Sequence, residues 1–389
     1  MFEAAFGDSS EWDPPGPVLS PPVTEPGGDA RIRLVVLFGG RSAEHEVSCT
    51  SALHVLRAVD RDRYDVVPIG ITRDGRWVDV EATTVTALSE GAGALPSPDD
   101  ARRSATLDAM PTLASVVGEE VVVLPLLHGP MGEDGTVQGL LELARVAYVG
   151  AGVLASATCM DKGAAKDVLA AHGLPQARHL TWRETDVDTA RVGEELGWPV
   201  FVKPANMGSS VGVTKVSVPA ELPAALATAL RYDEYVVVEE HVGGREIEVA
   251  VLGNAEPQAS VPGEIVPGAE FYDFDDKYGG DAAGLLVPAP LGPTEADDVR
   301  RLAVEAYRAL RVDGMARVDF FYEEHGRDGG AGRGFLVNEL NTIPGFTPIS
   351  MFPRLWESSG LPYGKLIDEL VRLAQERSAR RDRFATTRD

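Results

Sequence analysis

Short apolar runs alternate with helical stripes along the first third of the chain. RLVVLFGG (33–40), YDVVPIGIT (64–72) and VVVLPLLHG (121–129) have the length and composition of buried strands. Helical patterns follow the first and third runs, at about Glu46 to Val59 and in DGTVQGLLELA (134–144). A strand–loop–helix order predicts an α/β unit with a parallel sheet, whose ligands gather at the carboxyl ends of the strands.

The pattern changes near Met160. GAAKDVLAAHGLP (163–175) predicts a helix that stops at its glycine and proline. WPVFVKPA (198–205) and VGVTKV (211–216) predict two strands joined by NMGSS, and a helix and the strand EYVVVEEHV (234–242) follow. This segment therefore predicts a second unit with a different strand arrangement.

A third unit opens with the strand REIEVAVLGN (245–254) and closes with helices. Two helical faces are apolar throughout and predict core packing, with no chemistry implied. They consist of Val299, Leu302, Ala303, Ala306 and Leu310, and of Leu366, Ile367, Leu370, Leu373 and Ala374.

Three segments lack this regularity. Residues 1–30 are rich in proline and show no apolar periodicity, which predicts a disordered leader. Residues 82–115 have little pattern and predict a surface insertion. The arginines after Glu376 predict a frayed, solvated tail. The expected divisions are 1–30 (leader), 31–158 (N-terminal), 159–242 (central), 243–376 (C-terminal) and 377–389 (tail).

Composition narrows the functional classes. The 389 residues are 44% hydrophobic and carry a formal net charge of −24, which disfavours nucleic acid and anionic membrane as partners. No apolar run reaches the ~18–20 residues of a spanning helix, and no secretory signal is visible. Cys49 and Cys159 have neither disulfide-framework nor zinc spacing. We therefore expect a cytoplasmic protein with both cysteines as small core residues.

The strongest chemical pattern is GMARVDFFYEE (314–324) followed by GFLVNELNTIPG (334–345). The glycine-rich connection between these strand-like segments predicts an antiparallel pair. Residues two apart share a face of a strand, so Arg317 lies with Asp319, and Glu339 with Asn341. Three hard oxygen ligands beside one arginine suit a Mg²⁺ ion that also binds the phosphates of a substrate. The alternative is that these polar residues simply face water. It does not explain why charged residues stand within strands that otherwise look buried, where an unpaired charge is costly.

The segment KPANMGSSVG (203–212) is the second pattern. It lacks the Lys-Ser/Thr ending of a Walker A loop and is flanked by strands. Its backbone N–H groups can close over phosphates, and Lys203 can supply a cation to them. The alternative is an ordinary hairpin turn.

Four further residues have weaker signals. Glu44 follows a strand at a helix start, where its carboxylate can bind an ammonium group or simply favour the helix dipole. His128 stands at a strand's carboxyl end, although a lone histidine is more often structural. Glu239 and Glu246 flank a strand junction that could offer backbone groups to an adenine and a carboxylate to a ribose.

Together these segments resemble the D-alanine–D-alanine ligases of the ATP-grasp superfamily. The motifs are FGGRSAEHEVS, HGPMGEDGTVQGLLE, VKPANMGSSVG, EFYDFDDKY and RVDFFYEE…NELNTIPGFTPIS, in order over about residues 33–375. The resemblance implies a three-domain α/β fold, α+β in parts, with an N-terminal parallel-sheet domain and ATP between the other two domains. It also implies two Mg²⁺ ions, replaceable by Mn²⁺, and a homodimer.

The resemblance also implies residue roles. Glu44 would hold the first D-alanine's ammonium, and His128 would lie near that substrate. Ser209 and Tyr278 would join Glu44 in a hydrogen-bonded trio that closes the loop containing EFYDFDDKY. Arg317 and the backbone of Gly345 would stabilise an oxyanion, and Ser350 would bind the second carboxylate. The remaining roles are metal binding by Asp319, Glu339 and Asn341, and nucleotide binding by Lys162, Lys203, Ser209, Glu239, Val242, Glu246 and Lys277.

The implied reaction joins two D-alanines through an acyl phosphate, giving ADP and phosphate for peptidoglycan precursors. The intact Tyr278 favours the dipeptide over a depsipeptide. Two rivals are an ATP-grasp ligase of another class, such as a biotin-carboxylase-like enzyme, and a two-lobed amino-acid-binding protein. The first would lack SAEHEVS and EFYDFDDKY, and the second gives no reason for Asp319, Glu339 and Asn341 to converge.

Overall fold

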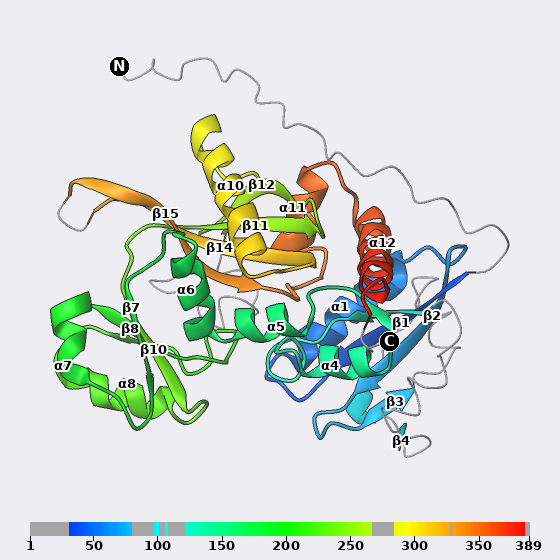
Figure 1. Ribbon diagram of the computed structural model, residues 1–389, viewed down its shortest axis with the longest axis horizontal. Coiled ribbons are helices and arrows are strands. Elements are labelled where there is room, and N and C mark those ends of the chain that lie inside the picture. Colours follow the sequence, from blue (N-terminus) through cyan, green and yellow to red (C-terminus); the bar gives the residue numbers. More distant parts are fainter. Residues whose placement is uncertain are drawn as a thin grey trace.

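A computed structural model describes residues 31–79, 97–100, 106–107, 121–266, 284–326 and 329–385. The leader, most of the expected insertion, and Lys277 and Tyr278 lie outside these residues. Three lobes are visible, coloured blue to cyan, green, and yellow to red along the chain (Figure 1). The expected mixture of a parallel sheet and antiparallel sheets is confirmed.

The N-terminal lobe is built on a six-stranded sheet in the order β4-β3-β2-β1-β5-β6. The neighbouring strands β2, β1, β5 and β6 are parallel, as the alternation of strands and helices predicts. Strands β3 and β4 form an antiparallel edge. The strands are β1 (Ile32–Gly39), β2 (Tyr64–Ile71), β3 (Trp77–Asp79), β4 (Thr106–Leu107), β5 (Val121–Pro125) and β6 (Ala147–Tyr148). The helices are α1 (His45–Ala58), η1 (Pro98–Asp100) and α4 (Thr136–Leu143).

The central lobe is a four-stranded antiparallel sheet in the order β7-β10-β8-β9. Its own hydrophobic core packs the sheet against α8, with Val200, Val236 and Leu226 among the buried residues. Its strands are β7 (His179–Arg183), β8 (Val200–Pro204), β9 (Thr214–Val216) and β10 (Tyr235–Glu240). The helical segments are α7 (Thr189–Arg191), η2 (Val192–Leu196), η3 (Pro219–Glu221) and α8 (Leu222–Ala229).

The C-terminal lobe is a five-stranded antiparallel sheet in the order β13-β12-β11-β14-β15. Its strands are β11 (Arg245–Gly253), β12 (Gln258–Val266), β13 (Gly284–Leu286), β14 (Gly314–His325) and β15 (Ala331–Asn341). Its helices are α10 (Pro293–Ala309), α11 (Met351–Ser358) and α12 (Tyr363–Asp382). The β14–β15 hairpin, in orange, extends from this sheet on the side of the green lobe (Figure 1).

The packing of the two helices that precede the central sheet does not follow the expected domain boundary at residue 159. Both α5 (Val153–Met160) and α6 (Lys162–Ala171) bury apolar residues against the C-terminal sheet. Cys159 and Leu169 belong to the same core as Val249 and Val318. The central sheet therefore keeps a separate core, and α6 belongs by packing to its neighbour.

The N-terminal and C-terminal lobes share one continuous core. Val36 and Leu56 of the first lobe lie in the same cluster as Phe352 and Leu366 of the last. Burial of this much apolar surface makes the two lobes a single packed body. Among the described residues, no helix combines the length and apolarity needed to cross a membrane.

The expectation of a frayed tail after Glu376 is wrong for residues 377–382. Helix α12 continues to Asp382, and Arg377 is only 3% exposed. Its guanidinium donates to the carbonyls of Gly150 (2.9 Å) and Tyr148 (3.2 Å), and Arg380 binds Asp313 (2.7 Å). An arginine can bury its stem while its head group satisfies carbonyls, so a charged run need not be solvated.

Candidate active site

A cavity of about 670 Å³ lies where the three lobes meet. Glu44 and His128 reach it from the N-terminal lobe, Lys203 from the central lobe and Arg317 from the C-terminal lobe. The predicted site residues that line it are Glu44, His128, Lys162, Lys203, Ser209, Glu246, Arg317, Asp319, Glu339, Asn341, Gly345 and Ser350.

The predicted pairing of the two polar strands is confirmed. Strands β14 and β15 are antiparallel, with Arg317 opposite Asn341 and Asp319 opposite Glu339. The four side chains therefore share one face, as the alternation predicts. The Asn341 amide nitrogen lies 3.3 Å from an Asp319 carboxylate oxygen, which places these two groups in contact.

Arg317 is held between two carboxylates. Its Nε and Nη2 each lie 2.7 Å from an Asp319 oxygen, and Nε lies 3.1 Å from Oε2 of Glu248. Burial opposes the charge of the guanidinium, but Asp319 and Glu248 outweigh it and raise the pKa of Arg317 well above its ordinary value. The arginine is thus a fixed cation beside the predicted metal ligands.

Glu248 was not singled out in the sequence, although a signal was present. It lies two residues after Glu246 on β11, so both side chains face the cavity, and β11 pairs it with Asp319. It is 6% exposed, which a solvated glutamate would not be. Alternation along REIEVAVLG could have found it.

The NMGSS segment closes against the N-terminal lobe. Ser209 Oγ donates a hydrogen bond to a Glu44 carboxylate oxygen, and a Cβ on Gly208 would lie 3.3 Å from the other oxygen. Ser209 and Ser210 have φ of 49° and 59°, a left-handed conformation that costs non-glycine residues energy. Lys162 Nζ donates to the Met207 carbonyl at 2.6 Å. The strained turn therefore brings the predicted partners Glu44 and Ser209 together.

Glu239 joins two lysines beneath the cavity. Lys203 Nζ lies 2.6 Å from Oε2 of Glu239, and Lys166 Nζ lies 3.2 Å from Oε1. Burial alone would raise the pKa of the Glu239 carboxyl, but the two lysines hold it well below its ordinary value. Lys166, 1% exposed, has a lowered pKa because of its own burial.

Lys166 was not predicted as a site residue, because it lies within a helix whose other residues are mostly small or apolar. Glu239 does not line the cavity, and its carboxylate fixes the position of Lys203. Val242 is buried with Ala177 and Leu336. The predicted nucleotide contacts of Glu239 and Val242 therefore remain predictions.

His128 and Glu133 form a buried corner of the cavity. His128 Nδ1 lies 2.9 Å from the Ile343 carbonyl oxygen, and burial lowers the pKa of its ring. Its Nε2 is buried with no hydrogen-bond partner within the described part of the chain. A buried polar atom without a partner suits a ligand that would form the missing hydrogen bond. Glu133 accepts a hydrogen bond from the Gly129 N–H at 2.8 Å.

The ionisation of Glu133 should weaken the fold. Burial, and then the charge of Glu44, raise the pKa of the Glu133 carboxyl to about 8 from an ordinary 4.5. Because the folded chain holds this proton more tightly than the unfolded chain, the stabilisation is complete below pH 4.5 and is lost as the pH rises through about 8. Glutamine cannot ionise. Between these pH values the unfolding free energy of Glu133→Gln should therefore rise relative to that of wild type, by at most about 5 kcal/mol.

Urea unfolding at a series of pH values measures this difference. Glutamine keeps an oxygen that can accept the Gly129 N–H, so the hydrogen bond is preserved. Parallel stability curves for the two proteins from pH 4.5 to above 8 would contradict the raised pKa of Glu133.

Gly345 lies beside Ser350, the residue that directly precedes α11. A Cβ on Gly345 would stand 3.0 Å from Ser350 Oγ, so a side chain there would displace the hydroxyl. Ser350 Oγ accepts a hydrogen bond from the Thr347 N–H at 3.1 Å. The N-terminal end of a helix favours a carboxylate, which agrees with the predicted binding of a substrate carboxylate.

The donor set on β14 and β15 fits a magnesium ion. Asp319 and Glu339 offer carboxylate oxygens and Asn341 an amide oxygen, which are the ligands that Mg²⁺ prefers. Within the described ranges, no group of three histidine, cysteine, aspartate or glutamate side chains could hold a metal. A metal on this face would therefore need the Asn341 amide, water or phosphate as further ligands.

Two antiparallel sheets face each other across this cavity, one with a lysine and a closing turn, the other with carboxylates and an arginine. This fold and this site define a ligase of the ATP-grasp class. Residues 33–151 match the family described as D-ala D-ala ligase N-terminus, and residues 168–372 match D-ala D-ala ligase C-terminus. The chain belongs to the D-alanine–D-alanine ligase family.

Individual relatives agree with this assignment. A D-alanine–D-alanine ligase of Streptomyces avermitilis is 47% identical over 372 residues, covering 89% of this chain and 94% of that protein. One of Halothermothrix orenii is 45% identical over 353 residues, covering 89% and 99%.

Solved structures show the same fold. The D-alanine–D-alanine ligase of Coxiella burnetii has a TM-score of 0.78 and 36% identity, and the match covers 91% of this chain and 96% of that one. The VanG D-Ala:D-Ser ligase of Enterococcus faecalis has a TM-score of 0.75 and 34% identity, covering 88% and 99%.

Proposed function

We propose that this protein uses ATP to join two D-alanine molecules into D-alanyl-D-alanine, with ADP and phosphate as the other products. The observation that carries the proposal is the meeting, in one cavity, of the Glu44–Ser209 pair with the polar face of β14 and β15. One half can hold an amino acid and the other a phosphate-rich nucleotide. Membership of the D-alanine–D-alanine ligase family supports this reading. The product would serve peptidoglycan precursor synthesis.

In the first step, a carboxylate oxygen of one D-alanine attacks the γ-phosphorus of ATP, and the bond to the β-phosphate oxygen breaks. Glu44 would hold the ammonium of this D-alanine. His128, whose buried Nε2 has no hydrogen-bond partner among the described residues, lines the same cavity. Lys162 and Lys203 would offset the negative charge of the phosphates. The products of this step are D-alanyl phosphate and ADP.

In the second step, the amine of another D-alanine attacks the acyl carbonyl and loses a proton. Ser350 would bind its carboxylate, and Arg317 with the Gly345 N–H would stabilise the oxyanion that forms. The carbon–oxygen bond to phosphate then breaks, leaving the dipeptide and inorganic phosphate. The strained NMGSS turn would exclude water, which otherwise hydrolyses the acyl phosphate.

Two Mg²⁺ ions, for which Mn²⁺ can substitute, would be held by Asp319, Glu339 and Asn341. When bound, they neutralise the phosphate charge that the lysines leave uncompensated. We further propose that Glu246 binds the ribose, that Val242 and Glu239 belong to the adenine site, and that Lys277 and Tyr278 complete the phosphate site and the closing loop. The protein is proposed to act in the cytoplasm as a homodimer.

Phosphate release measured with a panel of substrates tests the proposal. D-alanine should support ATP-dependent release, whereas L-alanine and bicarbonate should not. D-serine and D-lactate, each offered with D-alanine, test the acceptor when the ligated products are identified, because one structural relative is a D-Ala:D-Ser ligase. Release that depends on bicarbonate, or none with D-alanine, would remove the proposed function.

A further inference from the structure

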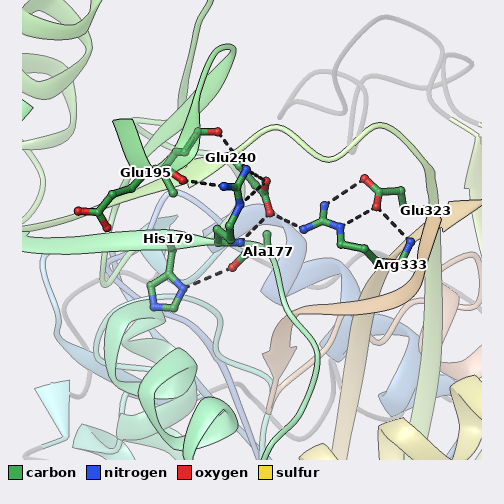
Figure 2. A network of polar contacts seen from close by, with 8 residues as sticks. Ala177, His179, Glu195, Glu240, Glu323 and Arg333 are labelled. Carbon is green, nitrogen blue, oxygen red and sulfur yellow. Dashed lines mark hydrogen bonds and ion pairs between the residues drawn. The ribbon is translucent and has the colours of Figure 1, made fainter. Parts of the chain in front are cut away.

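Glu240 lies at the point where the central lobe meets the C-terminal lobe. It ends β10, next to Glu239, whose side chain binds Lys203. Successive residues of a strand point to opposite faces, so Glu240 faces away from that lysine. Although acidic, its side chain is only 2% exposed. A buried carboxylate needs compensating partners, and here two arginines provide them (Figure 2).

Arg178 binds Glu240 from within the central lobe. Its backbone N–H donates to Oε1 at 2.8 Å, and its guanidinium donates to Oε2 at 2.7 and 3.0 Å. The same guanidinium donates to the carbonyl of Glu195 at 2.7 Å. Burial opposes ionisation, but the two arginines lower the pKa of the Glu240 carboxyl to about 2. Glu240 is therefore a fixed anion at physiological pH.

Arg333 binds Glu240 from the other lobe. Its Nη1 lies 2.6 Å from Oε1 of Glu240, and its Nε lies 2.6 Å from Oε2 of Glu323. Glu323 is on β14 and Arg333 on β15, so the guanidinium joins the long hairpin to the end of β10. Figure 2 shows the arginine between the two carboxylates.

Other contacts accompany Arg333 at this junction, and one of them is the buried Lys166–Glu239 pair, because α6 packs against the C-terminal sheet. The central sheet has its own hydrophobic core, and the cluster that crosses between the lobes here contains Ala177, Val242 and Leu336, with Phe321 packed against it. Two backbone hydrogen bonds accompany them, from the Val337 N–H to the Pro175 carbonyl at 2.8 Å and from the Lys162 N–H at the start of α6 to the Ala205 carbonyl at 3.1 Å. Arg333 adds to these contacts a side-chain link between the β14–β15 hairpin and the end of β10.

We propose that Arg333 and Glu240 are positioning residues that set the distance between the adenine end and the phosphate end of the ATP site. The segment from Glu239 to Glu246 is the proposed adenine and ribose site, and β14–β15 carries the proposed metal ligands at Asp319 and Glu339. One guanidinium ties these two elements together. The inference rests on the proposed function, because it assumes that ATP spans this junction.

Arg333→Ala should raise the KM for ATP by about tenfold. The KM for D-alanine should rise less, because Glu44 and His128 belong to the N-terminal lobe, which shares a core with the C-terminal one, whereas the central lobe reaches Glu44 through Ser209. Arg333→Lys should fall between wild type and alanine, since one ammonium cannot reproduce the forked contact with two carboxylates. Steady-state kinetics with each substrate varied in turn, and calorimetric binding of ADP with Mg²⁺, measure these effects.

Arg183→Ala is the matched control. Arg183 lies at the other end of β7 and binds Glu234 at 2.6 and 2.8 Å, again with a forked contact, but within the central lobe. Both replacements remove an arginine–glutamate pair. Of these two pairs, the one that contains Arg333 joins different lobes, and the one that contains Arg183 does not. The control should leave the KM for ATP at the wild-type value.

A double-mutant cycle with Glu240→Gln completes the test. If the two residues act through their contact, the double variant should raise the KM for ATP less than the product of the two single effects. Thermal melting shows whether each variant folds, and Arg333→Lys serves if alanine does not. An unchanged KM for ATP in folded Arg333→Ala, or equal rises for both substrates, would overturn the inference. Absence of D-alanine-dependent turnover in wild type would instead overturn the proposed function.

Discussion

Glu339→Gln should lower kcat by about a thousandfold or more while the protein stays folded. Glu339 stands opposite Asp319 on the paired strands and lies 3.7 Å from Lys162 Nζ. A metal ion contributes several kcal/mol of charge stabilisation to phosphoryl transfer, and each 1.4 kcal/mol is about tenfold in rate. Glutamine keeps the shape of the side chain but removes the charge that holds the ion. ADP formation in the presence of D-alanine measures the effect.

The matched control is Glu305→Gln, which removes a carboxylate paired with Arg301 on the surface of α10. It should leave kcat unchanged. The affinity for Mg²⁺, measured by calorimetry in the presence of ADP, should fall for Glu339→Gln and stay constant for the control. Near-normal turnover by Glu339→Gln would contradict the assignment of this face as the metal–phosphate site.

Arg317 replacement should give the second large effect. Arg317→Lys keeps the charge but loses the forked contact with Asp319, and we expect kcat to fall by about 100-fold to 1,000-fold, the usual loss when an oxyanion donor is removed. Arg317→Met also leaves Asp319 and Glu248 as buried carboxylates without their cation. Its free energy of unfolding should fall by about 3–5 kcal/mol, and Mg²⁺ with ADP should recover part of that loss.

Arg372→Lys is the control for these variants. Arg372 makes a forked contact with Glu369 at 2.6 and 2.8 Å on α12, away from the cavity. Its replacement should change neither kcat nor the response to Mg²⁺. If Arg317→Lys retained wild-type kcat, the oxyanion role of Arg317 would be wrong, although the metal assignment would stand.

Local pattern predicted the parts of the site that lie on regular strands. Alternation placed Arg317, Asp319, Glu339 and Asn341 on one face because the register of an antiparallel pair follows from two adjacent strands and their short connection. The parallel N-terminal sheet followed in the same way from the order of strands and helices. Such features depend on neighbours in the sequence.

Other residues could not be assigned because their partners lie far along the chain. Lys166 reads as one lysine in a helix until Glu239, 73 positions later, is seen beside it. Arg377 reads as part of a solvated tail until its guanidinium is seen on the carbonyl of Gly150. The contact between Glu240 and Arg333 likewise joins separate lobes. Burial, which decides the role of each charge, is set by the packing of the whole chain.

Isotope transfer from D-alanine to phosphate tests the central claim most directly. D-alanine labelled with ¹⁸O in its carboxyl group is incubated with ATP and Mg²⁺, and the dipeptide, ADP and phosphate are analysed by mass spectrometry. If the carboxylate attacks the γ-phosphorus, dipeptide, ADP and phosphate should form in equal amounts, and each phosphate should carry one ¹⁸O atom. Phosphate without ¹⁸O, or no dipeptide from D-alanine, would contradict ligation through an acyl phosphate.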